Sequence, residues 1–236
     1  MSELLLEPTS ALAIKTELED GVEKNKKAQH TVDNSWHVLR EYTAARIGLG
    51  RAGISVPTKH LLDFQLAHAQ AQDAVHLPLN IEQLSNDITL ENSALKIINV
   101  HSKVIDRAHY LQRPDLGRRL NDESIKTLTE HAAAINQSYD VAIVVVDGLS
   151  SYAVQKNSPP FLTQLIQRLA SQNLMPLPVE TYKQPDYRLA PLVVVEQGRV
   201  AIGDEVAQLL NAKSVLVLIG ERPGLSSPDS LGLYLT

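Results

Sequence analysis

Residues 141–148 read VAIVVVDG, a run of six apolar residues followed at once by an aspartate and a glycine. A continuous apolar run, unlike an alternating one, is typical of a strand that is buried on both faces of a sheet. Residues 192–195 and 215–219 form two further runs of the same kind. The second half of the chain is therefore expected to contain at least three buried strands.

Helical patterns separate these strands, over residues 161–170, where two prolines come first, and over residues 204–210. Strands that alternate with helices indicate crossover connections and a parallel sheet. A short strand is also expected over residues 95–100. Earlier in the chain, apolar spacing and helix-start residues predict helices over 36–47, 57–77 and 123–135.

The predicted fold class is α/β, with a helical N-terminal region followed by a domain with a mostly parallel sheet. Residues 1–34 are charged and contain few large apolar residues, which is typical of a flexible arm. Residues 35–137 are expected to form a mainly helical domain. Residues 138–236 are expected to form the sheet domain.

Composition excludes several kinds of chemistry. The 236 residues contain no cysteine, which rules out a disulfide scaffold, a thiolate metal site and a cysteine nucleophile. His60, His68 and His76 lie eight apart, so they do not form a metal-ligand pattern, and we expect no protein-bound metal. The net charge of −5 gives no support for nucleic-acid binding. No long apolar run or basic leader occurs, so we expect a cytoplasmic protein without membrane contact.

Two loops follow predicted strands, where ligands collect in open α/β sheets. Residues 147–151 (DGLSS) resemble a nucleophile elbow but lack its closing glycine, so a loop that faces a ligand or a subunit is favoured over a serine hydrolase. Residues 220–224 (GERPG) form a sharp turn that brings Glu221 and Arg222 to the same crevice. The alternative for this second loop is a solvated turn with a local Glu–Arg pair.

Two further motifs have simple structural interpretations. Residues 48–53 (GLGRAG) match the dinucleotide pattern G-x-G-x-x-G, but a helix precedes them and Pro57 delays the next one. A glycine-broken turn between helices is therefore favoured. Residues 113–119 (RPDLGRR) concentrate three arginines, which suit either a binding interface or a set of salt bridges within the chain.

Together these stretches resemble the small-subunit family of ethanolamine ammonia-lyase. The resemblance rests on five ordered blocks: residues 39–53 (LREYTAARIGLGRAG), 62–76 with LDFQLAHA and DAVH, 110–120 with YLQ and the arginine-rich turn, 147–150 (DGLS), and 220–225 (GERPGL). It covers about residues 36–236.

The resemblance implies a Rossmann-like domain at residues 138–236 that covers adenosylcobalamin, bound base-on, against a large subunit similar to a TIM barrel. The complex would convert ethanolamine to acetaldehyde and ammonia, in the cytoplasm or inside a bacterial microcompartment. The chain would supply no catalytic acid or base and would not be active alone. Two family cobalamin contacts fall on Val200, in the stretch G-R-V, and on Glu221.

Family members continue past the stretch LGLYLT at residues 231–236, so we expect the closing C-terminal segment of the domain to be missing. Weaker cofactor retention is expected as a result. Two alternatives remain open at this point: a stand-alone α/β protein that binds a nucleotide or cofactor, and a truncated scaffold subunit without catalytic activity.

Overall fold

The computed structural model describes residues 30–91, 95–135, 138–170 and 188–236. Most of the arm predicted over residues 1–34 lies outside these ranges. The described helices are η1 (Ser35–Glu41), α2 (Thr58–His76), α3 (Ile81–Glu91), α4 (Arg107–Gln112), η2 (Leu116–Arg118), α5 (Asp122–Ile135), α6 (Ser151–Ala170) and α7 (Ile202–Leu209). The described strands are β1 (Ile97–His101), β2 (Tyr139–Val146), β3 (Leu192–Glu196), β4 (Ala212–Gly220) and β5 (Leu231–Leu235).

The strands form one five-stranded sheet in the order β1-β3-β2-β4-β5. The strands β1 to β4 are parallel to their neighbours, and β5 runs antiparallel to β4. Val146, at the end of the central strand β2, pairs with Val195 of β3 and with Ile219 of β4. The predicted α/β fold with a mostly parallel sheet is confirmed.

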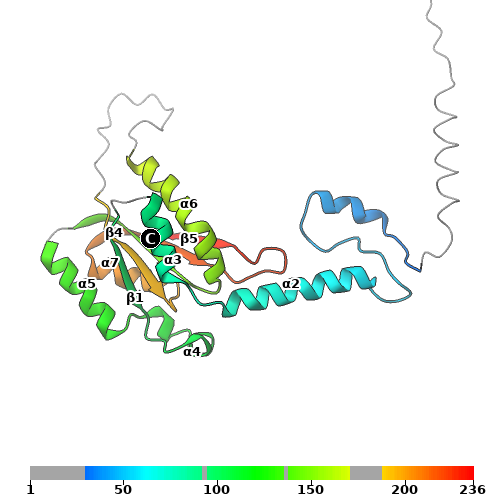
Figure 1. Ribbon diagram of the computed structural model, residues 1–236, viewed down its shortest axis with the longest axis horizontal. Coiled ribbons are helices and arrows are strands. Elements are labelled where there is room, and N and C mark those ends of the chain that lie inside the picture. The colour runs from blue at the N-terminus through cyan, green and yellow to red at the C-terminus, as the bar shows by residue number, and fades with distance from the viewer. Residues whose placement is uncertain (1–29, 92–94, 136–137, 171–187) are drawn as a thin grey trace, which may run out of the picture. The chain divides into compact units, whose positions relative to one another are not determined.

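Helices cover both faces of the sheet (Figure 1), which explains why its strands are apolar throughout. On one face, Leu128 of α5 and Val206 of α7 pack into a core with alternate residues of the strands. On the other face, Leu84 of α3 and Leu162 of α6 pack into a second core. All four side chains are fully buried. The central strand β2 has side chains in both cores, and this packing holds its C-terminal end in place.

Helix α6 begins at Ser151, well before the start predicted at residue 161, and it continues through the prolines at 159–160. The hydroxyl of Ser150 accepts a hydrogen bond from the backbone N–H of Ala153 at 3.2 Å, which satisfies a free donor of the first turn. Val154 and Leu162, on either side of the prolines, are both fully buried in the second core, so the helix packs against the sheet before and after them. The prediction that the prolines open this helix was wrong.

The helix predicted over residues 36–47 is shorter than expected, because only the 3₁₀ helix η1 forms there. Asn34 caps η1 by accepting a hydrogen bond from the backbone N–H of Trp36 at 2.9 Å. The glycine-rich segment at 48–53 connects η1 and α2, and its three glycines all have positive φ angles. The interpretation of this segment as a turn between helices is confirmed.

The described chain forms two compact units, one ending at Leu66 and one beginning at Ala67. This division differs from the boundary predicted between residues 137 and 138. The reason is strand β1, which pairs with β3 from Ile97 opposite Leu192 to His101 opposite Glu196. Residues from the expected helical region are thereby part of the same sheet as the second half of the chain.

Within the described ranges, no helix is long and apolar enough to cross a membrane. The same residues include no group of three or more histidine, aspartate or glutamate side chains that could hold a metal ion.

Candidate functional site

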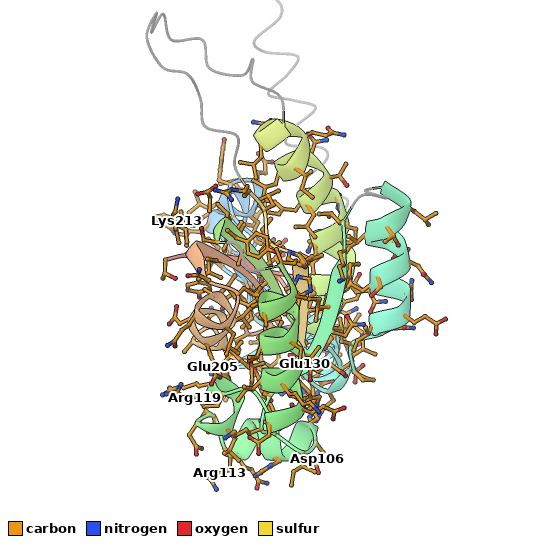
Figure 2. The ribbon with its side chains drawn as sticks, turned by 90° about the vertical axis from the view of Figure 1, so that its left-hand side faces the viewer. Asp106, Arg113, Arg119, Glu130, Glu205 and Lys213 are labelled. Carbon is orange, nitrogen blue, oxygen red and sulfur yellow. The ribbon has the colours of Figure 1, made fainter. Side chains whose placement is uncertain are left out.

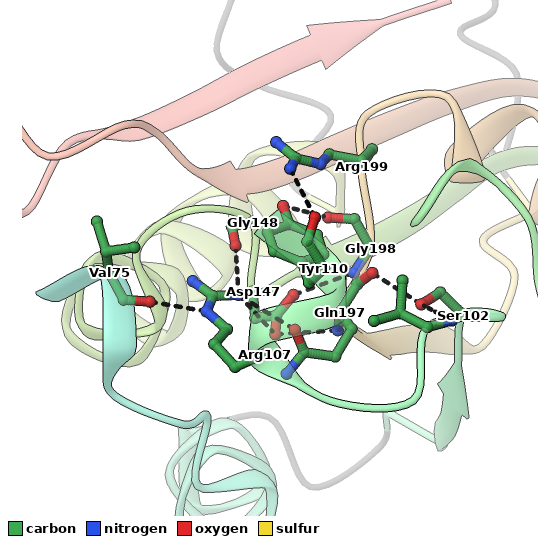
Figure 3. A network of polar contacts seen from close by, with 10 residues as sticks. Val75, Ser102, Arg107, Tyr110, Asp147, Gly148, Gln197, Gly198 and Arg199 are labelled. Atoms are coloured by element: carbon green, nitrogen blue, oxygen red, sulfur yellow. Dashed lines mark hydrogen bonds and ion pairs between the residues drawn. The ribbon is translucent and has the colours of Figure 1, made fainter. Parts of the chain in front are cut away.

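The carboxyl ends of four parallel strands meet at one edge of the sheet. The strands β1, β2, β3 and β4 end at His101, Val146, Glu196 and Gly220. In open α/β sheets, this edge is where ligands bind. Helix α4 follows β1, and it contributes two side chains, Arg107 and Tyr110, to the polar network at this edge (Figure 3).

Asp147 is the centre of this network. Its side chain comes directly after β2 and is only 1% exposed. One carboxylate oxygen accepts the backbone N–H of Gln197 at 3.0 Å, and the other accepts that of Gly198 at 3.2 Å (Figure 3). The guanidinium of Arg107 lies 3.8 Å from the same carboxylate. Asp147 therefore ties the loop after β2 to the loop after β3.

Arg107 joins three segments of the chain. Its Nε donates to the backbone carbonyl of Val75 at 2.7 Å, near the end of α2. Its Nη1 donates to the carbonyl of Gly148 at 2.9 Å and to the side-chain oxygen of Gln197 at 3.3 Å. The ion pair with Asp147 adds to these bonds. Arg107 thus connects α2 with the loops after β2 and β3.

The ring of Tyr110 is fully buried beneath two cations. The guanidinium carbons of Arg199 and Arg107 lie 4.0 Å and 4.6 Å from its centre, within the range of cation–π attraction. Its hydroxyl donates to the carbonyl of Gly198 at 3.0 Å, and Arg199 donates to the backbone carbonyl of Tyr110 at 3.1 Å. The turn after β3 is therefore held by α4 as well as by Asp147.

Burial shifts the titration of these groups. It raises the pKa of Asp147 to about 6, although the N–H of Gln197 and the charge of Arg107 act in the opposite direction. Burial also lowers the pKa of Arg107 and raises that of Tyr110. At neutral pH the network therefore contains an ionised Asp147, a charged Arg107 and a neutral Tyr110.

The loop at residues 147–151 was predicted to face a ligand or a subunit, but its polar side chains point into the protein. Asp147 and Ser150 are both buried. The Ser150 hydroxyl donates to the carbonyl of Pro228 at 3.1 Å and accepts the N–H of Ala153. A hydroxyl engaged in this way caps α6 and fastens the loop after β4, so the resemblance to a nucleophile elbow is only in the sequence.

The two residues implied as cofactor contacts, Val200 and Glu221, both follow strands that flank β2. Val200 lies in the turn between β3 and α7, is half-buried, and packs against the core on the α7 face. Glu221 follows β4 and is also half-buried. Its carboxylate accepts the Tyr234 hydroxyl at 2.6 Å, and this bond raises the pKa of that tyrosine. Both residues are at the carboxyl edge, where the sequence had placed Glu221.

The loop after β4 is fastened to α6 rather than free in solvent. Lys156 forms an ion pair with Asp229 at 2.5 Å, and the Asn157 side chain donates to the carbonyl of the same aspartate at 2.8 Å. The backbone N–H of Glu221 donates to the carbonyl of Ser230 at 2.9 Å. These bonds limit the range of positions that Glu221 can take.

The arginine-rich turn lies at the surface between α4 and α5 (Figure 2). Arg113 makes a two-bond pair with Asp115, at 2.9 and 2.7 Å. Arg119 lies 3.8 Å from the carboxylate of Glu205 in α7. Both arginines remain more than half exposed, so salt bridges within the chain still leave them accessible.

A mostly parallel sheet covered by helices on both faces defines the class of open α/β proteins. Within this class, residues 33–236 match the model of the family described as ethanolamine ammonia-lyase light chain (EutC). The chain belongs to this family.

Curated relatives agree with the family model. The chain is 52% identical to the ethanolamine ammonia-lyase small subunit of Pseudomonas fluorescens (strain SBW25) over 204 residues, which cover 86% of this chain and 68% of the relative. It is 50% identical to the protein of the same name from Pseudomonas aeruginosa (strain LESB58) over 206 residues, or 87% of this chain and 70% of the relative. The predicted family resemblance is confirmed.

The sequence did not reveal Arg107 and Tyr110 as members of the site. Tyr110 begins one of the five family blocks, which assigned it no role. The helix α4 that carries both residues is capped by Asp106, which accepts the N–H of His109 at 2.8 Å. The partners of Arg107 lie 32 to 90 residues away in the sequence. Only the packing of the sheet brings them together.

Proposed function

We propose that this chain is the small subunit of an ethanolamine ammonia-lyase, which together with a large subunit converts ethanolamine to acetaldehyde and ammonia. The observation that carries the proposal is the family match over residues 33–236. The names of the relatives support it, because a small subunit works with a larger partner. We further propose that this partner resembles a TIM barrel and that the complex acts in the cytoplasm or in a bacterial microcompartment.

We propose that adenosylcobalamin is held base-on between the two subunits, with Val200 and Glu221 of this chain in contact with it. When bound, the cofactor supplies the carbon radical on which such a lyase depends. Glu221 suits the amide groups at the rim of a corrin ring, because a carboxylate that accepts one bond from Tyr234 can accept further N–H donors. The half-buried Val200 offers apolar contact.

In this proposal the chain binds and orients the cofactor and keeps water from it, and none of its residues is a catalytic acid or base. Two features of the carboxyl edge suit that task. The loop with Glu221 is anchored to α6 through Asp229, and the turn with Val200 is anchored through Asp147. Rigid loops suit a binding surface, because less freedom is lost when the ligand binds.

The first test supplies ethanolamine to three components, the purified full chain, the large subunit of a related enzyme and adenosylcobalamin, and it measures acetaldehyde. Acetaldehyde is expected only when all three are present. Activity of this chain without the large subunit would refute the proposal. Stable co-elution of the two subunits without any activity would instead support a scaffold role.

Substitution of Glu221 by alanine is expected to raise the cobalamin concentration needed for half-saturation of the complex by about 10-fold, because a hydrogen bond to a charged group is lost. An absorbance titration of the assembled complex measures this. Tyr234→Phe is the matched control, since it removes the partner of Glu221 and leaves the carboxylate in place. Equal titrations for Glu221→Ala and the unchanged protein would contradict the assignment.

A further inference from the structure

The turn from Gln197 to Val200 has a backbone geometry that needs support. Gln197 has a φ angle of 54°, in the left-handed region that side-chain-bearing residues seldom adopt. Such a conformation persists only when the surroundings hold it in place. The neighbouring Gly198 has no room for a larger side chain, because a Cβ there would overlap the side chain of Val146.

Asp147 and Ser102 hold this turn from two sides. The two oxygens of Asp147 accept the consecutive N–H groups of Gln197 and Gly198, at 3.0 and 3.2 Å. Ser102, which is 1% exposed, donates its hydroxyl to the carbonyl of Gln197 at 2.8 Å. The N–H groups of Gln197 and Gly198 and the carbonyl of Gln197 are therefore all hydrogen-bonded to buried side chains.

A buried carboxylate is a costly way to stabilise a fold. Desolvation of a charge is unfavourable, and well-packed apolar residues often serve stability as well or better. Asp147 also lies at the ligand-binding edge, and the turn that it holds leads directly into Val200. These facts together indicate that Asp147 serves to hold the turn before Val200 in its conformation more than to stabilise the fold.

We infer that Asp147, held by Arg107, is a positioning residue that fixes the turn at Gln197 and Gly198 and thereby sets the place of Val200 for cobalamin. This inference rests on the proposed function. It adds a residue that does not itself touch the cofactor but controls one that does. Ser102 is a second positioning residue in the same arrangement.

Asp147→Asn separates this role from simple packing. An asparagine has nearly the same shape, but one of its two terminal atoms is an NH₂ donor, which would face a backbone N–H in place of an acceptor. One anchor of the turn is thereby lost, while the volume of the core stays the same. Because a hydrogen bond to a charged group is lost, we expect the cobalamin dissociation constant to rise about 10-fold.

The experiment uses the complex of the full chain with the large subunit. Adenosylcobalamin is titrated and followed by its absorbance, and the KM for the cofactor and kcat are measured on the same samples. Asp140→Asn is the matched control: Asp140 lies at the other end of β2 and also accepts a backbone N–H, from Arg188 at 3.0 Å, and a cation, Lys213 at 2.7 Å.

The expected result for Asp147→Asn is a rise in both the dissociation constant and the KM for cobalamin, with kcat at saturation within about two-fold of the unchanged protein and normal subunit co-elution. Asp140→Asn is expected to bind as the unchanged protein does. Unaltered cobalamin affinity in an assembled Asp147→Asn complex would overturn the inference. Failure of the unchanged complex to take up cobalamin would overturn the proposed function itself, and the inference with it.

If Asp147→Asn does not assemble, Ser102→Ala decides the question, because it removes two neutral hydrogen bonds, to the carbonyl of Gln197 and from the N–H of Val104, and leaves no buried charge without a partner. Its expected effect is a rise of about 3-fold in the cobalamin dissociation constant. An unchanged constant in that variant would overturn the inference.

Discussion

Gly148→Ala is expected to lower the free energy of unfolding by about 3 kcal/mol or more, since two separate costs add. Gly148 has a φ angle of 57°, which costs a side-chain-bearing residue about 1–2 kcal/mol. A Cβ at this position would also overlap the carbonyl oxygen of Gly220 and the side chain of Ile219. The loop after β2 would have to move away from the end of β4.

Gly53→Ala is the matched control for this prediction. Gly53 has a similar φ angle of 62°, but a Cβ there would meet no atom within 4 Å. Its substitution is expected to show the conformational cost alone, about 1–2 kcal/mol. Urea unfolding of the full chain, followed by circular dichroism, measures both variants. Equal losses for the two would show that the close contact between β2 and β4 adds no cost.

Arg107→Met is expected to lower the free energy of unfolding by about 3–5 kcal/mol at pH 8, because it leaves the buried carboxylate of Asp147 without its cation. Three further hydrogen bonds, to Val75, Gly148 and Gln197, are lost at the same time. Methionine preserves much of the side-chain volume. The loss therefore reports on charge and hydrogen bonding more than on packing.

The effect of Arg107→Met is expected to depend on pH. Burial holds the pKa of Asp147 at about 6 in the folded chain, above the ordinary value of 3.8. The folded chain therefore binds the proton of Asp147 more tightly than the unfolded chain does. As a result, the contribution of Asp147 to the free energy of unfolding falls as the pH rises from about 4 to about 6. Without Arg107 the pKa would rise further. The loss caused by the substitution should therefore be smaller at pH 5, where Asp147 is mostly protonated, than at pH 8.

Urea unfolding at pH 5 and pH 8 tests this dependence. Arg113→Met is the control, because Arg113 also pairs with an aspartate, Asp115, but the pair is exposed to solvent. We expect no measurable change in the unfolding midpoint for that variant, since water screens the pair. A loss for Arg107→Met that is equal at both pH values would mean that the charge of Asp147 does not contribute.

The strands were predictable because their signal is local. The apolar runs at 141–146, 192–195 and 215–219 lie within β2, β3 and β4, since a strand buried on both faces needs apolar residues on both sides. Strand β5 and helix α3 were not predicted. The register of β5 depends on its partner β4, with Leu233 opposite Leu218. The five residues of β5 contain no pattern that predicts this pairing.

The candidate site was predictable only in part. A strand end followed by polar residues and glycine pointed to Glu221 and to the loop at Asp147, and family resemblance added Val200. The direction of a side chain was not predictable, because Asp147 and Ser150 turn inward only after the loops from β3 and β4 supply partners for them. Arg107 and Tyr110 come from α4, whose short sequence carries no sign of the sheet edge that it joins.

The sequence by itself determined the fold class, the apolar strands and the family, since these depend on residue types in local order. Tertiary structure alone decided that Asp147 is buried beside Arg107, that Gln197 is held in a left-handed conformation, and that the Ser150 hydroxyl donates to Pro228. The physical reason is that each of these features joins groups from different strands and helices. Their geometry and their desolvation exist only once the sheet and its covering helices have packed.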